Sequence, residues 1–130
     1  MKKKLILLFA VFIVVSVFIG CTEDDDKYTS LSIDTQYDGL PIDPDGYVVY
    51  TFTTGTAGVY TISLTNLASD LSWYLYDEEY GDEIDYCDYN WDSGDEIGTT
   101  PVLSANTLYY ILIDEYDGVG GTFSILIESP

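Results

Sequence analysis

The sequence predicts an all-β fold, an antiparallel, jelly-roll-like β-sandwich of seven or eight strands. Short runs of alternating apolar and polar residues follow residue 30, as expected for strands with one buried face. Clusters of Gly, Pro, Asp and Asn separate these runs, and no stretch keeps the period of an amphipathic helix. About 100 residues suffice for one small domain, so we expect a single domain over residues 31–130.

Five runs are strong strand predictions and two are weaker. The first run, 47–53, alternates and follows an Asp-Pro-Asp-Gly turn at 43–46. A Gly-Thr-Ala-Gly turn at 55–58 predicts that this run forms a hairpin with the next one. The weaker candidates are residues 84–89 and 96–102. The side chains expected to face the core are Val48, Tyr50 and Phe52; Tyr60, Ile62 and Leu64; Leu71, Trp73 and Leu75; Tyr109, Ile111 and Ile113; and Phe123, Ile125 and Ile127.

A tyrosine corner is predicted at Tyr109. The segment 103–109 (LSANTLY) has the form of the arch that enters a strand in Greek-key sandwiches, where a tyrosine hydroxyl bonds back to upstream backbone. We expect this hydroxyl to satisfy a buried carbonyl, which makes Tyr109 a structural residue.

Five segments together resemble the bacterial pre-peptidase C-terminal domain. They are YTF (50–52), GTAGVYTISL (55–64), DLSWYLYD (70–77), LSANTLYYI (103–111) and GGTFSI (120–125). The similarity runs from about Leu31 to Glu128. It implies a jelly-roll-like sandwich that usually serves as an accessory module on secreted peptidases and other surface proteins. Related collagen-binding modules bind calcium and protein ligands, but no residue here matches their calcium-binding segment.

The N-terminus has the layout of a lipoprotein signal peptide, predicted over residues 1–20. Three lysines precede an apolar run, and Gly20-Cys21 resembles the end of a lipobox. The run is shorter than the roughly 20 residues that a membrane-spanning helix needs. We expect lipid attachment at Cys21 and a flexible acidic tether in the remainder of residues 21–30. The protein would then be anchored by lipid in the cell envelope, at the outer membrane or cell surface.

The chain after the signal segment is strongly acidic. It holds one lysine against 23 carboxylates, a net charge of −22. Such a charge repels nucleic acid and anionic lipid surfaces, so we do not expect DNA, RNA or peripheral membrane binding. The membrane is therefore reached through the lipid alone. Thirteen tyrosines, two tryptophans and many aliphatic residues still permit a folded core.

Catalysis is not predicted. The sequence contains no histidine, which removes Ser-His-Asp and Cys-His catalysis as well as histidine-bound zinc. Paired carboxylates suffice for a glycosidase, but many acids on a small domain form close pairs by chance. A small carboxylate-dependent hydrolase is therefore only the third-ranked alternative.

Calcium is the cofactor that the sequence suggests, because loops rich in Asp, Glu and Gly supply the oxygen ligands it prefers. The candidate stretches are 77–85, 88–96 and 114–117. In the middle stretch the proposed ligands are Asp88, Asn90, Asp92 and Asp95. The alternative is a solvated acidic surface without a specific site.

Cys87 has no disulfide partner if Cys21 carries lipid, so the fold cannot depend on a disulfide. We interpret Cys87 as a small, semi-buried strand residue. A reactive thiol is the alternative, which the surrounding carboxylates disfavour because they raise its pKa.

Eight aromatic side chains cannot all fit inside so small a sandwich. They are Tyr74, Tyr76, Tyr80, Tyr86, Tyr89, Trp91, Tyr110 and Tyr116. Exposed rings beside carboxylates are typical of sugar-binding and protein-binding surfaces. The alternative to a binding surface is that half of them only cover the outer sheet faces, where tyrosine is common. We place the binding surface at Tyr74, Tyr76, Trp91 and Tyr116. The predicted function is a non-enzymatic envelope lipoprotein that binds an extracellular glycan or protein. The alternative is a structural or accessory lipoprotein within an envelope assembly.

Overall fold

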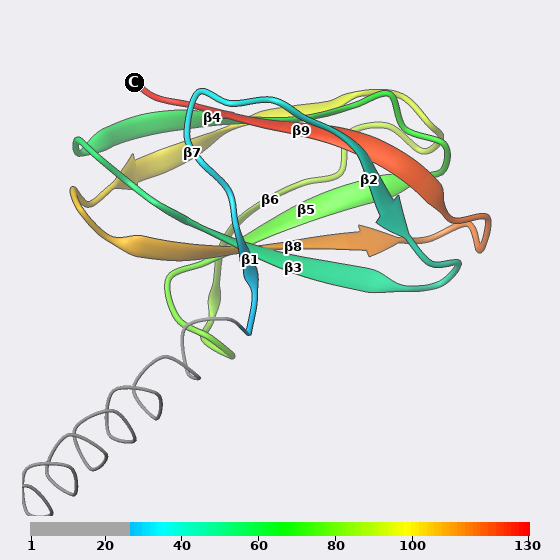
Figure 1. The fold of residues 1–130 in the computed structure, drawn as a ribbon, viewed down its shortest axis with the longest axis horizontal. Helices are drawn as coiled ribbons and strands as arrows, with labels where there is room; N and C mark the ends of the chain where they lie inside the picture. The colour runs from blue at the N-terminus through cyan, green and yellow to red at the C-terminus, as the bar shows by residue number, and fades with distance from the viewer. Residues whose placement is uncertain (1–26) are drawn as a thin grey trace, which may run out of the picture.

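The computed structural model describes residues 27–130, which form two packed β-sheets and no helix (Figure 1). The predicted signal peptide and Cys21 lie outside these residues. Within the described part, no helix is long and apolar enough to cross a membrane.

Residues 27–130 contain nine strands. They are β1 (Thr29–Ser30), β2 (Tyr37–Ile42), β3 (Tyr47–Thr53), β4 (Gly58–Thr65), β5 (Leu71–Tyr76), β6 (Glu83–Cys87), β7 (Glu96–Leu103), β8 (Leu108–Glu115) and β9 (Gly121–Glu128). Sheet A has the order β1-β3-β8-β5-β6, and sheet B has the order β2-β9-β4-β7. All neighbours are antiparallel except β1 and β3. The predicted β-sandwich is confirmed, and β1 and β2 are the strands that the sequence analysis did not include.

The chain changes sheets at every connection among these strands except the β5–β6 hairpin. The predicted hairpin between the runs 47–53 and 58–65 is wrong. β3 lies in sheet A against β8, whereas β4 lies in sheet B between β7 and β9. The turn between them therefore crosses the sandwich, and Thr54 N donates to Thr107 O at 3.0 Å to join it to the crossing that enters β8.

The core consists of the inward faces that the alternation predicts. All of the predicted core-facing side chains are buried, except Val48, which is half-buried. Trp73, Tyr60, Phe52 and Phe123 are the largest of the fully enclosed side chains. Each such aromatic ring removes about 150–250 Å² from water, so these four rings contribute a large share of the hydrophobic stabilisation.

The tyrosine corner at Tyr109 is confirmed, with one correction. The backbone N–H of Ser104 donates to the Tyr109 hydroxyl at 2.9 Å, so the partner is an amide and not the expected carbonyl. Tyr109 is buried and its ring stacks on Phe52, with 5.8 Å between the ring centroids. The hydroxyl is therefore held at the end of the arch by packing of the ring below it.

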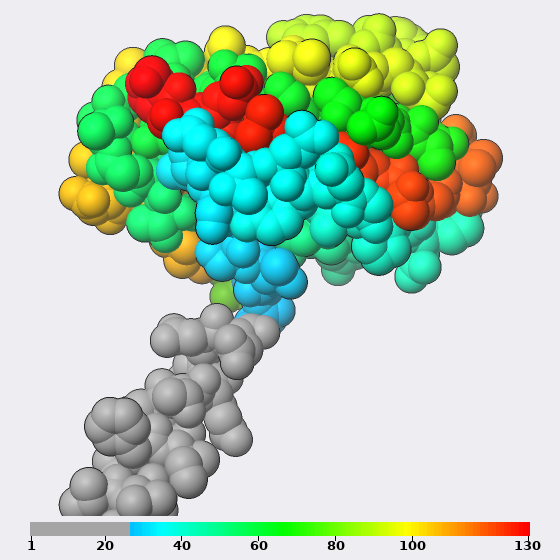
Figure 2. Space-filling model, turned by 45° about the horizontal axis from the view of Figure 1, so that its top comes forward, coloured from blue at the N-terminus to red at the C-terminus, as the bar shows by residue number. Residues whose placement is uncertain are grey.

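A second arch repeats the first. Residues 31–37 read LSIDTQY, against LSANTLY at 103–109. Ser32 N–H donates to the Tyr37 hydroxyl at 2.9 Å, and the fourth residue of each arch has a left-handed backbone, with φ of 56° at Asp34 and 48° at Asn106. One arch carries the chain from sheet A to sheet B and the other carries it back. In Figure 2 the segment that includes the first arch is drawn in cyan and lies beside β9, drawn in red.

We expect Tyr109→Phe to destabilise the sandwich by about 1–3 kcal/mol, because it leaves the Ser104 N–H without its acceptor. Denaturant unfolding measures this as a lower midpoint at an unchanged slope. Tyr47→Phe is the matched control, since the Tyr47 side chain is 70% exposed. Equal midpoints for the two variants would show that the Tyr109 hydroxyl contributes nothing to the arch.

Candidate binding site

The outward face of sheet A is built from tyrosine and aliphatic side chains. In the strand register Tyr110 of β8 lies between Thr51 and Tyr76, and Leu112 lies between Val49 and Tyr74. All of these residues except the buried Thr51 are half-buried, and they alternate along the strands with the core-facing residues, so their side chains point away from the core. The face therefore presents aromatic and aliphatic groups across three neighbouring strands.

A groove of about 340 Å³ lies on this face. Its lining residues, which define the tyrosine groove, are Tyr28, Tyr47, Val49, Tyr76, Glu78, Glu79, Tyr80, Tyr110 and Leu112. Five tyrosines and two aliphatic residues form most of the walls, and two glutamates supply the negative charge. Such a mixture of apolar rings and a few polar groups is typical of a ligand-binding surface.

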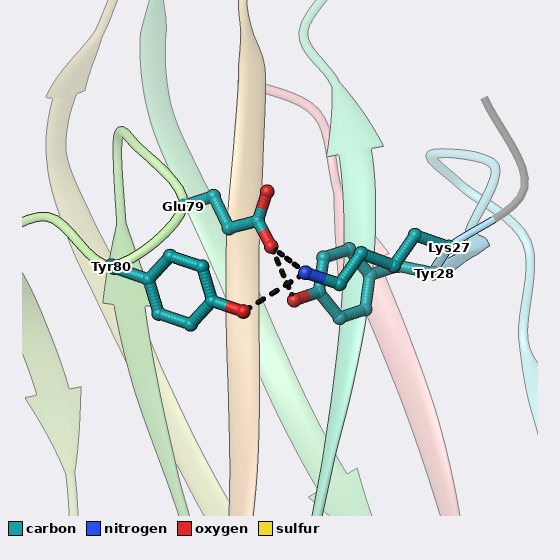
Figure 3. A network of polar contacts seen from close by, with 4 residues as sticks. All are labelled: Lys27, Tyr28, Glu79 and Tyr80. Atoms are coloured by element: carbon teal, nitrogen blue, oxygen red, sulfur yellow. Dashed lines mark hydrogen bonds and ion pairs between the residues drawn. The ribbon is translucent and has the colours of Figure 1, made fainter. Parts of the chain in front are cut away.

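Four side chains form a polar network at the groove (Figure 3). Lys27 forms an ion pair with Glu79 and donates to the Tyr80 hydroxyl at 2.9 Å. Tyr28 donates its hydroxyl to Glu79 Oε1 at 2.7 Å, and its ring meets Tyr110 edge-on with 5.9 Å between centroids. Two segments about 50 residues apart in the sequence, one before β1 and one between β5 and β6, thus meet here.

The segment assigned to the tether contributes to the domain. Thr29 and Ser30 form β1 and pair in parallel with Tyr50 and Thr51 of β3. Tyr28 lines the groove. The residues directly before the predicted domain start at residue 31 are therefore part of sheet A and of the candidate site.

The structure brings together three of the four predicted binding residues. Tyr74 and Tyr76 lie on the outer face of β5, and the hydroxyl of Tyr116 hydrogen-bonds to that of Tyr74. Tyr74 also stacks on Tyr86, with 6.1 Å between centroids. Trp91 lies apart, in the loop between β6 and β7, with 94% of its side chain exposed.

Of the four predicted residues only Tyr76 lines the groove itself. The sequence analysis missed Tyr28, Tyr47, Glu78 and Glu79. For Tyr47 a signal was available, because it alternates with Val48 and therefore points outward from β3. Tyr28 and Glu79 carry no such signal, since only the tertiary fold brings their segments together.

A buried glutamate organises the loop 88–96. Glu96 is fully buried, and its carboxylate accepts the backbone amides of Tyr89 at 2.8 Å and Asn90 at 2.7 Å. The Asn90 side chain donates to the backbone oxygen of Asp95, and Asp92 Oδ1 accepts the Gly94 amide. Of the side-chain oxygens of the four proposed calcium ligands, Asp92 Oδ1 is thus already engaged by a hydrogen bond within the loop.

Within residues 27–130 no three Asp, Glu or Cys side chains are grouped so that they could hold a metal ion. The residues Asp88, Asn90, Asp92 and Asp95 are thus not assembled as a coordination site. Several acids do lie near one another here. Burial first, and then the negative charge of Asp88 and other acids, raise the pKa of Asp70. Calcium binding at these residues stays a prediction, and it requires the loop to rearrange.

A second buried glutamate, Glu115, comes from another of the acidic stretches. Its carboxylate accepts the amide of Asp45 at 2.5 Å, and those of Asp117, Gly118 and Val119 at 3.2 Å. These amides belong to the turn between β2 and β3 and to the turn between β8 and β9. One carboxylate therefore joins two sheet crossings.

Glu115 is ionised over the whole physiological range. Burial by itself raises its pKa, but the hydrogen bonds from Asp117 and from the surrounding backbone amides outweigh burial and hold the pKa at about 2. The folded state thus favours the charged form, and the resulting stabilisation is present above the ordinary pKa of 4.5.

We expect Glu115→Gln to lower the stability at pH 7 by about 1–3 kcal/mol, because an amide accepts these hydrogen bonds less well than a carboxylate. The difference from wild type should shrink as the pH falls from 4.5 to about 2, where Glu115 itself becomes protonated. Denaturant midpoints over this range measure it. Exposed Glu128→Gln is the control, and an equally small change in both variants would contradict the role assigned to Glu115.

Cys87 is a strand residue, as expected, but it is fully buried and not semi-buried. Its surroundings disfavour a reactive thiol. Its thiol donates to Glu96 Oε2 at 3.3 Å. Burial first, and then the hydrogen bond to Glu96 and the charge of Glu96, raise the pKa of the thiol to about 12. The thiolate is therefore absent at neutral pH.

The sequence matches no protein-family model and no curated protein. Among solved structures, the pre-peptidase C-terminal domain of a collagenase from Bacillus anthracis matches with a TM-score of 0.63 and 22% identity, over 78% of this chain and 94% of that chain. A periplasmic inhibitor of g-type lysozyme from Aeromonas hydrophila matches with a TM-score of 0.52 and 15% identity, over 78% and 97%. At these identities the comparisons show the fold, which is the β-sandwich that the sequence resemblance implies.

Proposed function

We propose that this protein is a non-enzymatic, lipid-anchored binding module of the cell envelope, and that its tyrosine groove holds an extracellular glycan or protein. The observation that carries this proposal is the groove itself, in which five tyrosines from four separate segments of the chain line one hollow. A purely structural role predicts rings scattered over the surface. The contiguous arrangement favours binding.

The groove is suited to recognition because its walls are rigid. Tyr47, Tyr76 and Tyr110 project from neighbouring strands of one sheet, so their backbones are fixed before any partner arrives. A tyrosine side chain has few rotatable bonds and combines an apolar ring with a polar hydroxyl. Binding therefore restricts the motion of these side chains only slightly, and the small entropy cost favours affinity.

The charged groups at the groove do not favour catalysis. A general acid needs a raised pKa, whereas hydrogen bonds from Lys27 and then Tyr28 lower the pKa of Glu79. Glu79 therefore stays ionised and engaged with its partners. The lysozyme inhibitor with the same fold is likewise described as an inhibitor and not as an enzyme.

The envelope location rests on the sequence of residues 1–21, where a basic and apolar segment precedes a cysteine suited to lipid attachment. A lipid anchor would hold the described domain by a short segment, with sheet A close to the point of attachment through β1. The negative charge of the chain disfavours nucleic acid as a partner.

The proposal is tested by probing glycan and matrix-protein arrays with the full-length protein in detergent. Two variants form a matched pair, because Tyr47 and Tyr89 are both 70% exposed but only Tyr47 lines the groove. We expect Tyr47→Ser to lose at least about tenfold in affinity for the partner that wild type selects, as is usual for a central interface tyrosine. Tyr89→Ser should bind as wild type does. Equal binding by the two variants, or no partner for wild type, would contradict the proposed site.

A further inference from the structure

Lys27 occupies a position in the tyrosine groove that is built to hold an ammonium group. Its Nζ pairs with Glu79 and lies 5.1 Å from the centroid of the Tyr28 ring and 5.0 Å from that of Tyr80. Both distances fall within the roughly 6 Å over which an aromatic ring attracts a cation. Two rings, one carboxylate and the Tyr80 hydroxyl thus surround the charge. We call Tyr28, Glu79 and Tyr80 the ammonium box (Figure 3).

The box is open to solvent, so its occupant can exchange. The side chain of Lys27 is 55% exposed and that of Glu79 is 33% exposed. An ion pair at such a surface contributes little to folding stability. The arrangement is therefore poorly explained as a fold-stabilising contact, and a competing cation from solution has direct access to the same carboxylate and rings.

The domain itself has no second basic side chain that could fill the box. Lys27 is the single basic residue after residue 4, whereas 19 carboxylates lie in residues 27–130. Glu78 lines the groove beside Glu79. A neutral glycan gains nothing from this field, but a cationic protein is steered toward it and presents the groups that the box accepts.

We propose that the tyrosine groove recognises a lysine-bearing segment of a cationic protein, and that a partner ammonium group takes the place of Lys27 in the ammonium box. This inference rests on the proposed function and selects protein over glycan. Lys27 then acts as an internal occupant that keeps the box filled in the free protein. The adjoining walls, Tyr47, Val49 and Leu112, contact the aliphatic stem of the bound lysine and its neighbours.

The test measures binding of a fluorescein-labelled peptide of alternating lysine and glycine to the full-length protein in detergent, by anisotropy at fixed ionic strength. Removing the competitor in Lys27→Ala should tighten binding about fivefold, and removing the carboxylate in Glu79→Gln should weaken it about fivefold. Each change corresponds to about 1 kcal/mol. The same peptide with glutamine in place of lysine should not bind.

Two control variants separate the box from diffuse attraction. Glu128→Gln removes one carboxylate from an exposed position on sheet B, and it is the control for Glu79→Gln. Thr99→Glu on β7 is the control for Lys27→Ala, because both variants make the net charge more negative by one. Both should bind the peptide within about twofold of wild type, because exposed charges at a distance are screened by salt. If Glu79→Gln matches Glu128→Gln, or Lys27→Ala matches Thr99→Glu, the inference is wrong.

The same variants distinguish a failure of this inference from a failure of the proposed function. If Tyr47→Ser abolishes binding to the partner found on the arrays while Glu79→Gln leaves that binding unchanged, the groove binds a partner without a cationic contact. A neutral glycan would give that result. Loss of binding in both variants, with tighter binding in Lys27→Ala, supports the ammonium box.

Discussion

Backbone amides at the sheet crossings are the constraint on which this structure depends. Because nearly every connection passes from one sheet to the other, most loops cannot continue a strand ladder as a hairpin would. A buried amide without an acceptor costs about 1–3 kcal/mol. The protein meets this requirement with side-chain oxygens. Tyr37 and Tyr109 each accept an amide of an arch, and Glu96 and Glu115 each accept two or more amides of a loop.

This use of carboxylates as acceptors changes the meaning of the acidic composition. An ionised carboxylate accepts hydrogen bonds and donates none, so it suits a loop with several free amides. Glu96 and Glu115 serve the fold in this way, and both come from stretches that resemble calcium loops in composition alone. The exposed acids form the negative field instead. Since these side-chain contacts lie at the ends of the sandwich, where the chain crosses between sheets, the outer face of sheet A remains free to present its tyrosines.

The inward faces of the strands were predictable, whereas the pairing of strands was not. Alternation identifies Trp73 or Ile111 as core residues because it depends only on neighbours in the sequence. It does not say which strand lies beside which, and the Gly-containing turn after β3 suits a crossing as well as a hairpin. The second arch was detectable, since Leu31, Ser32 and Tyr37 repeat the pattern around Tyr109.

The candidate site was predictable only in part, for a related reason. Tyr74 and Tyr76 share an outward face by alternation, so their place on the surface follows from the sequence. The groove also needs Tyr28 and Glu79, which are 51 positions apart and meet only after β1 pairs with β3 and the β5–β6 turn folds over it. Acidic residues are the hardest to interpret, because the sequence does not distinguish an acid buried within a loop from an acid exposed on its surface.

The central claim, that side-chain oxygens hold the sheet crossings, is tested most directly by amide hydrogen exchange resolved by NMR on the full-length protein in detergent. The amides of Ser32, Ser104, Asn90 and Val119 lie outside the strands but donate to Tyr37, Tyr109, Glu96 and Glu115. The account predicts that they exchange at least about tenfold more slowly than the same amides in an unstructured chain. Exchange at the unstructured rate at these four positions would contradict it.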